Sequence, residues 1–338
     1  AIYAILKVYD RPGGVLTPAY SCIEVAKAVS QAGYFPVFID NELDTLNINI
    51  RSIKKSLSDE ITIILPVHIF GIPCNMEEIR NGSSHTSRLI LEDAAPAFGA
   101  KLNGKPVGKF GDASVISFHW TKTISGEGGG AILTDNDEFA GKLDAYLLDK
   151  KISNHCTYLF FKAMLRKMVT TKWFYRFFHY VRRQITGEAM FEVVQYKEII
   201  SQKQIGKMSG FSCALILRQF DQLEWNLNRR NQIAQIYFEE LSNLEYLRIP
   251  KYVKGSLPSW IQFPVLVDDK FAFYKHMQKH GIDVTWSYRY SCPDTYDMGG
   301  YANSQEIAKS ILGLPTYPTL SDAEAREICL AARKYKNF

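Results

Sequence analysis

Apolar residues recur in two patterns along this chain. Short runs rich in β-branched residues alternate with stretches in which apolar positions are spaced three or four residues apart. The first pattern is typical of buried strands and the second of amphipathic helices. The strands predicted in this way are 15–18, 35–40, 61–67, 88–94, 113–118 and 129–134. This alternation favours a mainly parallel sheet covered by helices, so we expect an α/β layer domain in the first half of the chain.

Helical spacing continues into the second half. The predicted helices are 1–9, 23–33, 51–59, 209–241 (as one or two helices), 270–281 and 322–335. A further strand is predicted at 260–267, between the long helical segment and the last two helices. We therefore expect two domains, a large one over 1–225 and a smaller C-terminal α/β domain over 226–338.

The segment 156–184 differs from its surroundings because it is rich in aromatic and basic residues. On a helix, its apolar residues fall on one face, namely Trp173, Phe174, Phe177, Phe178 and Val181, while its basic residues tend to the other, namely Lys172, Arg176, Arg182 and Arg183. Such a helix could rest on an anionic membrane surface through 160–184. It could also pack against the body of the protein or a second subunit, which is the interpretation we favour. Too many charges interrupt it for a spanning helix.

Composition narrows the classes of protein that remain. With 338 residues and 46% hydrophobic side chains, the chain is long enough to bury two cores. Its 40 basic and 35 acidic residues give a net charge of +5, and no long run of one sign indicates a nucleic-acid partner. We see no signal peptide and no apolar run long enough to cross a bilayer.

The six cysteines lie far apart, without a C-x-x-C pair and without a histidine and cysteine cluster at zinc spacing. This usage indicates reduced thiols and a cytoplasmic protein. It also predicts no metal site.

The densest group of chemically active residues lies between 89 and 133. Asp93 ends an apolar strand, where the ligand-binding groups of α/β sheets are found. Lys122 follows a later strand and precedes the glycine-rich turn 126–130, which lets the backbone approach a bound group. Singly, each has an ordinary explanation: a solvated lysine, a helix-capping aspartate and a simple turn.

Together these residues suit one kind of chemistry. A lysine amine held out of water loses its proton more easily, so it can attack an aldehyde and form a Schiff base. A carboxylate placed against a pyridine nitrogen keeps that nitrogen protonated and makes the ring a better acceptor of carbanion electrons. Ser117, at a strand end, offers a hydroxyl to a phosphate group.

The same stretch resembles the DegT/DnrJ/EryC1/StrS family of sugar aminotransferases. The family motifs E-D-A-A-Q-A-x-G-A, S-F-x-x-x-K and G-E-G-G correspond here to Glu92 to Ala95 with Ala97, Gly99 and Ala100, to Ser117 and Phe118 with Lys122, and to Gly126 to Gly129. Similarity extends to flanking segments such as PVHIFG (66–71), KMSGF (207–211) and GIDVTWSY (281–288). The resemblance implies the α/β fold of type I transferases that depend on pyridoxal 5'-phosphate (PLP).

The resemblance also implies roles for six residues. Lys122 would carry PLP and move protons, Asp93 would pair with the pyridine nitrogen, Ser117 would bind the phosphate, Cys22 would stand where an aromatic residue commonly stacks on the ring, and His119 and Tyr288 would line the substrate site. Family members are homodimers with active sites at the interface. They move an amino group from glutamate to a nucleotide-linked keto sugar, for surface polysaccharide or glycan biosynthesis.

Several positions depart from the family pattern. Pro96, Phe98, Ile205 and Ser287 replace a glutamine, a histidine, an asparagine and a histidine, respectively. The printed sequence also begins at Ala1, without Met and without the S-G-T-x-A-L phosphate cradle of the family. We therefore expect that it lacks the extreme N-terminus of the family.

Three functions remain open from sequence. An aminotransferase is the hypothesis we favour. A PLP-dependent sugar dehydratase is a rival, although those relatives replace the lysine with histidine, and Lys122 argues against this role. A catalytically inactive scaffold or regulator is the third hypothesis, and the four departures from the family pattern motivate it.

Overall fold

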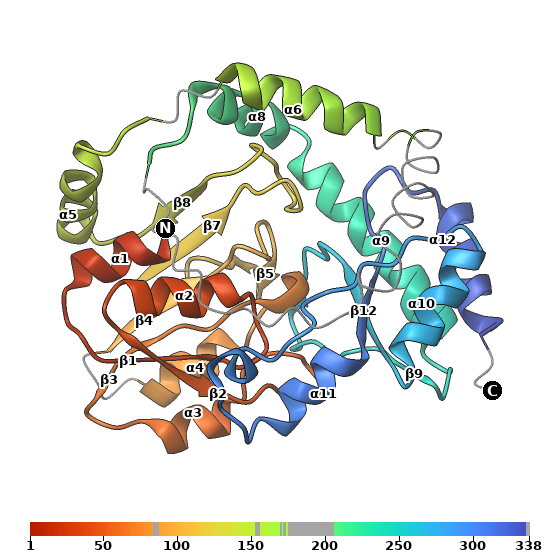
Figure 1. The fold of residues 1–338 in the computed structure, drawn as a ribbon, viewed down its shortest axis with the longest axis horizontal. Coiled ribbons are helices and arrows are strands. Elements are labelled where there is room, and N and C mark those ends of the chain that lie inside the picture. Colours follow the sequence, from red (N-terminus) through yellow and green to blue (C-terminus); the bar gives the residue numbers. More distant parts are fainter. Residues whose placement is uncertain (84–87, 153–155, 170, 172–173, 175–205, 336–338) are drawn as a thin grey trace.

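A six-stranded sheet forms the middle layer of the N-terminal part of the molecule (Figure 1). The computed structural model describes residues 1–338 except 84–87, 153–155, 170, 172–173, 175–205 and 336–338. Its strands run in the order β2 (Phe35–Ile39), β1 (Gly14–Pro18), β3 (Ile61–Ile64), β4 (Leu89–Asp93), β7 (Ala113–Ser117) and β8 (Gly130–Leu133). All neighbours are parallel except β7 and β8. The six strands predicted from the apolar runs form this sheet, so a mainly parallel α/β architecture is confirmed.

Helices cover both faces of this sheet because both faces are apolar. Successive residues of a strand point to opposite sides, so Val15 of β1 joins one core cluster and Leu16 joins another. The first cluster receives apolar residues from α1 (Ile2–Tyr9), α2 (Ile23–Gln31) and α5 (Asp137–Leu148). The second cluster receives them from α3 (Ile50–Ser56) and α4 (Met76–Ser83).

A second core fills the C-terminal part. The antiparallel strands β9 (Leu247–Arg248), β11 (Phe263–Val267) and β12 (Ile311–Leu314) form a sheet in the order β12-β11-β9. It packs against α9 (Leu223–Leu241), α10 (Lys270–Lys279) and α12 (Asp322–Arg333). The segment expected as one or two long helices forms two, α8 (Gly210–Phe220) and α9.

The two cores are in contact. Leu266 of β11 and Ile307 of α11 (Ala302–Ser310) lie in the core cluster of the large sheet. A small sheet of β10 (Ser256–Leu257), β5 (Lys101–Leu102) and β6 (Lys105–Pro106) also joins distant parts of the chain. The boundary predicted between 225 and 226 lies near the start of α9, and the division of the chain there stays a prediction.

The aromatic and basic segment begins as α6 (Cys156–Val169), which runs along α8 (Figure 1). Half-buried residues recur at helical spacing on α6, among them Leu159, Lys162 and Arg166, whereas Phe161 and Leu165 are exposed. The two cations therefore lie on the better buried side of α6. Apart from Phe174, which is exposed, the face predicted for 172–183 lies outside the described residues.

Among the helices that the structure describes, none is both long enough and apolar enough to cross a bilayer.

Candidate active site

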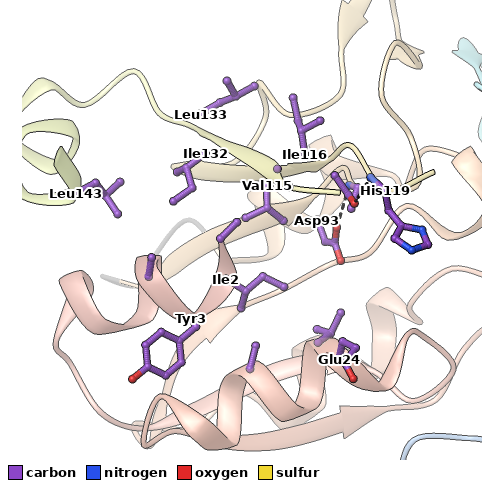
Figure 2. Close-up of a pocket in the computed structure, with 18 of the residues that line it drawn as sticks. Ile2, Tyr3, Glu24, Asp93, Val115, Ile116, His119, Ile132, Leu133 and Leu143 are labelled. Carbon is purple, nitrogen blue, oxygen red and sulfur yellow. Dashed lines mark hydrogen bonds between the residues drawn. The ribbon is translucent and has the colours of Figure 1, made fainter. Parts of the chain in front are cut away.

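All six candidate residues line one pocket of about 1850 Å³. They are Cys22, Asp93, Ser117, His119, Lys122 and Tyr288. The pocket lies at the carboxyl ends of β4 and β7, and Figure 2 shows Asp93 and His119 at one end of it and Tyr3 and Leu143 towards the other. Residues separated by more than 250 positions in the sequence are thus brought to one site. The pocket exceeds the roughly 300–1,000 Å³ that is typical of small-molecule sites.

Asp93 is the last residue of β4 and is 4% exposed. Its backbone is held by hydrogen bonds to the Pro66 carbonyl (2.9 Å) and from the His68 amide (3.2 Å). The carboxylate Oδ1 accepts a hydrogen bond from the Ala95 amide at 2.9 Å. Burial raises the pKa of Asp93, although Ala95 and the positive charge of Lys122 act against this rise. A cation bound beside the carboxylate would therefore favour its ionised form.

Lys122 projects from the loop that follows β7. Burial lowers the pKa of its amine, and the nearby Asp93 and Cys22 partly offset this effect. Its backbone amide donates to the His119 carbonyl at 2.9 Å, so Lys122 lies in a tight turn. A buried amine with a lowered pKa is unprotonated more often, and is therefore a better nucleophile, than a surface lysine.

The glycines of the 126–130 turn are required by the geometry of this loop. The backbone of Phe118 joins the two ends of the loop by hydrogen bonds. Its carbonyl accepts from the amides of Gly126 (2.9 Å) and Gly128 (3.2 Å), and its amide donates to the Gly129 carbonyl (3.0 Å). Gly129 has a φ of +87°, and a Cβ there would lie 2.3 Å from the sulfur of Met208. Glycine at this position avoids both the strain and the overlap.

Cys22 and Tyr288 come from opposite ends of the chain. Cys22 is the residue that precedes α2, and Tyr288 is held by a hydrogen bond from the Tyr20 hydroxyl to its carbonyl at 3.2 Å. Burial raises the pKa of the Cys22 thiol and that of the Tyr288 hydroxyl. Both side chains are therefore neutral near pH 7, so they line the pocket without adding charge.

Ser117 and His119 stand at the end of β7. The Ser117 hydroxyl accepts a hydrogen bond from the His119 amide at 3.3 Å, and His119 Nδ1 lies 3.0 Å from the Thr121 hydroxyl. Partial burial and the positive charges of Lys122 and Arg166 lower the pKa of His119. Near pH 7 the imidazole is therefore neutral, so it can donate or accept a hydrogen bond but adds no cation to the site.

The departures from the family motifs have different surroundings. Pro96 lines the pocket, and its carbonyl accepts a hydrogen bond from Ser259 at 3.3 Å. Phe98 packs edge-on against the rings of Phe118 and Phe220, in an apolar cluster.

The hydroxyl of Ser287 donates to the side-chain oxygen of Gln262 at 3.0 Å. Neither Phe98 nor Ser287 lines the pocket as described, and Ile205 lies outside the described residues.

Sequence reasoning missed the buried pair of His68 and Glu92. The His68 ring lies 2.9 Å from Glu92 Oε1, and the same carboxylate accepts from the amides of Gly108 (2.5 Å), Phe110 (2.9 Å) and Gly111 (3.0 Å). These hydrogen bonds outweigh burial and lower the pKa of Glu92. The pair holds the 108–111 loop against the pocket. Its signal in the sequence is a polar residue inside each of two apolar runs, which demands a buried partner.

The donor set fits a phosphorylated pyridine aldehyde. Asp93 supplies a buried carboxylate, Lys122 an amine with a lowered pKa, and Ser117 a hydroxyl, all in one pocket. These are the groups that a protonated ring nitrogen, an aldehyde carbon and a phosphate oxygen would require.

Comparisons with known proteins agree with this fold. The chain is 27% identical to the uncharacterized protein MJ1066 of Methanocaldococcus jannaschii, over 97% of this chain and 81% of that protein. It is 26% identical to the dTDP-4-amino-4,6-dideoxy-D-glucose transaminase of Shigella dysenteriae, over 99% of this chain and 83% of that protein. The solved structure of S. venezuelae DesV, in complex with a ketimine intermediate, is similar with a TM-score of 0.76 at 21% identity, over 98% of this chain and 81% of that one.

A family model matches nearly the whole chain, from residue 2 to residue 333. The match includes the three motifs that carry Asp93, Ser117 and Lys122. The resemblance read from these motifs is thereby confirmed: the chain belongs to the DegT/DnrJ/EryC1/StrS aminotransferase family.

Proposed function

We propose that this protein is a PLP-dependent aminotransferase that passes an amino group from glutamate to a nucleotide-linked keto sugar, in surface polysaccharide or glycan biosynthesis. The observation that carries the proposal is the presence of a buried Asp93 and of Lys122 in one pocket. The family match and the relative that is a dTDP-sugar transaminase support it.

Each candidate residue has a role in this proposal. When bound, PLP supplies an electron sink for carbanion chemistry. Lys122 holds the cofactor and afterwards moves the proton at the reacting carbon, while Asp93 keeps the ring nitrogen protonated. Ser117 would donate to the phosphate, and Cys22 would take the place of the aromatic side chain that commonly stacks on the ring. His119 and Tyr288 contact the substrate.

We further propose a cytoplasmic homodimer with active sites at the subunit interface. The support for this part is the family relationship, because the resemblance implies homodimers with active sites at the interface; in this chain Lys207 and Met208 line the pocket. Light scattering of the purified protein should give twice the mass of one chain. A monomer at working concentrations would contradict the dimer.

For the segment 160–184, peripheral membrane contact is the alternative to the packing that we favour, and it can be tested. The exposed residues of α6 include Phe161 and Leu165, and the segment 156–184 contains basic but no acidic residues. Exposed apolar residues and positive charge together favour an anionic lipid surface. Leu165→Glu should weaken flotation with vesicles that contain phosphatidylserine, whereas Leu330→Glu, at a similarly exposed position on α12, should not. Absence of flotation by the parent protein would contradict this contact.

Single-turnover spectroscopy tests the proposed activity. Purified protein loaded with PLP should convert the cofactor to its amine form when glutamate is added, and a keto sugar linked to UDP, dTDP or GDP should restore the original spectrum. The Lys122→Ala variant should show neither spectral change. Cofactor binding without this half-reaction would favour dehydration or an inactive protein, and absence of cofactor binding would contradict the enzyme.

A further inference from the structure

One side chain of α6 contacts the loop that carries Lys122 at two points. We call residues 118–129 the Lys122 loop. Arg166 Nη1 lies 2.6 Å from Glu127 Oε1, and the guanidinium carbon lies 4.6 Å from the centre of the Trp120 ring. Trp120 precedes Lys122 by two residues and Glu127 follows it by five. Arg166 therefore bridges the two sides of the loop across the position of Lys122.

The geometry of Glu127 shows that its carboxylate needs a cation. Its side chain is 7% exposed, and Oε2 accepts no hydrogen bond from the described residues, with Lys162 Nζ 3.9 Å away. Its φ of +64° is a conformation that costs free energy for any residue other than glycine. A buried carboxylate left without a partner is strongly destabilising. The ion pair with Arg166 supplies this partner.

The contact between Arg166 and Trp120 is a cation–π contact, unlike the ion pair with Glu127. A planar guanidinium stacks on an aromatic face, which an ammonium group cannot do equally well. Trp120 remains half exposed, so it is not held by burial in the core. The cation–π contact of Arg166 with Trp120 therefore restrains the part of the loop immediately before Lys122.

Other hydrogen bonds restrain the Lys122 loop at Ser125 and at Phe118. The Gln219 side chain of α8 donates to the Ser125 carbonyl at 2.7 Å and accepts from the Ser125 amide at 3.1 Å. The backbone of Phe118 is hydrogen-bonded to the end of the loop. These contacts are made by α8 and by the loop itself. The contacts of Arg166 come instead from α6, a helix in which no residue is buried.

We propose that Arg166 is a positioning residue, which holds the Lys122 loop so that the lysine amine is directed into the pocket. The effect on catalysis rests on the proposed function, but the restraint of the loop does not. Through this contact the aromatic and basic segment is linked to the active site.

Hydrogen exchange measured by mass spectrometry tests the restraint on the protein without added cofactor. Arg166→Gln should increase exchange of the Lys122 loop by about tenfold, because it removes a charged hydrogen bond to a buried group. Lys162→Gln removes the same charge from the same helix but from a contact of 3.9 Å, so exchange should change less than about twofold. Equal exchange in the parent and in Arg166→Gln would overturn the proposal.

A second measurement separates positioning from general stability. The rate at which added PLP attaches to Lys122 should fall about tenfold in Arg166→Gln and in Glu127→Gln. Glu127→Gln leaves no unpaired buried charge, so its thermal unfolding midpoint should stay closer to that of the parent than the midpoint of Arg166→Gln. The double variant should be no slower than either single variant, because both remove one interaction. Arg166→Lys should recover part of the rate. Additive losses, or a loss matched by Lys162→Gln, would contradict the positioning role.

The two measurements fail in different ways. If the parent protein does not bind PLP, the proposed function is wrong, while the exchange result still decides whether Arg166 restrains the loop. If PLP attaches at the same rate to the parent and to Arg166→Gln, the positioning role is wrong and the proposed function stands.

Discussion

Burial acts in opposite directions on the pKa values of Lys122 and Asp93. It lowers the pKa of the amine and raises that of the carboxyl, and each residue helps the other to keep its charge. The pair is thus coupled, so a change at one residue must appear in the titration of the other.

Asp93→Asn should therefore lower the pKa of Lys122 further, because it removes a negative charge that raises it. The midpoint of Lys122 modification by an amine-selective reagent, followed against pH by mass spectrometry, should move to lower pH. Ser117→Ala leaves the charges unchanged and serves as the control. A midpoint that stays in place or moves to higher pH would show that the two residues are not coupled.

The same Asp93→Asn variant should lose activity by about 100-fold or more, the order expected for loss of one electrostatic contact at a reacting group. The single-turnover rate with glutamate measures this. Ser117→Ala should instead weaken PLP affinity and leave the rate of the saturated enzyme closer to that of the parent. If both variants reacted at the parent rate, the roles given to these residues would be wrong.

At the level of elements, the glycines of the Lys122 loop differ from those of helices. Gly129→Ala introduces strain at a φ of +87° and an overlap with Met208, so the free energy of unfolding should fall by about 1–3 kcal/mol. Gly141, inside α5, has open space around it, and Gly141→Ala should raise that free energy by about 0.5–1 kcal/mol. Urea unfolding measures both, and equal effects would refute the distinction.

The strands could be predicted because each is a short apolar run bounded by polar residues, and the chemistry could be predicted where it lies within one stretch, from Asp93 to Gly129. Contacts between distant segments could not. Nothing local pairs His68 with Glu92 or brings Tyr288 to Cys22. The apolar and basic faces predicted from sequence concern 172–183, and the sequence did not indicate which side of α6 is turned to the body. Lys162 and Arg166 lie on the better buried side of α6, beside Glu127.

At the level of the whole molecule, one buried amine should make stability depend on pH. Lys270 is 6% exposed, and burial lowers its pKa from 10.5 to about 7. Its Nζ donates to the Ala308 carbonyl at 2.9 Å, which a neutral amine can also do. Between pH 7 and 10.5 the unfolded chain binds more protons at this residue than the folded one. The free energy of unfolding should therefore rise with pH across this window.

Lys270→Met should reduce the rise of the unfolding free energy with pH by about 1.4 kcal/mol for each unit by which the pKa of Lys270 is lowered. Urea unfolding at pH 7 and pH 10 measures it, with Lys279→Met near the end of α10 as an exposed control. A slope that persists in Lys270→Met would locate the pH dependence elsewhere.

The central claim is that Lys122 carries PLP, and chemical trapping tests it most directly. The purified protein is incubated with PLP, reduced with borohydride, digested and analysed by mass spectrometry. A pyridoxyl phosphate group should be found on the peptide that contains Lys122, and Lys122→Ala should carry none. Absence of the label, or a label confined to other lysines, would contradict the account.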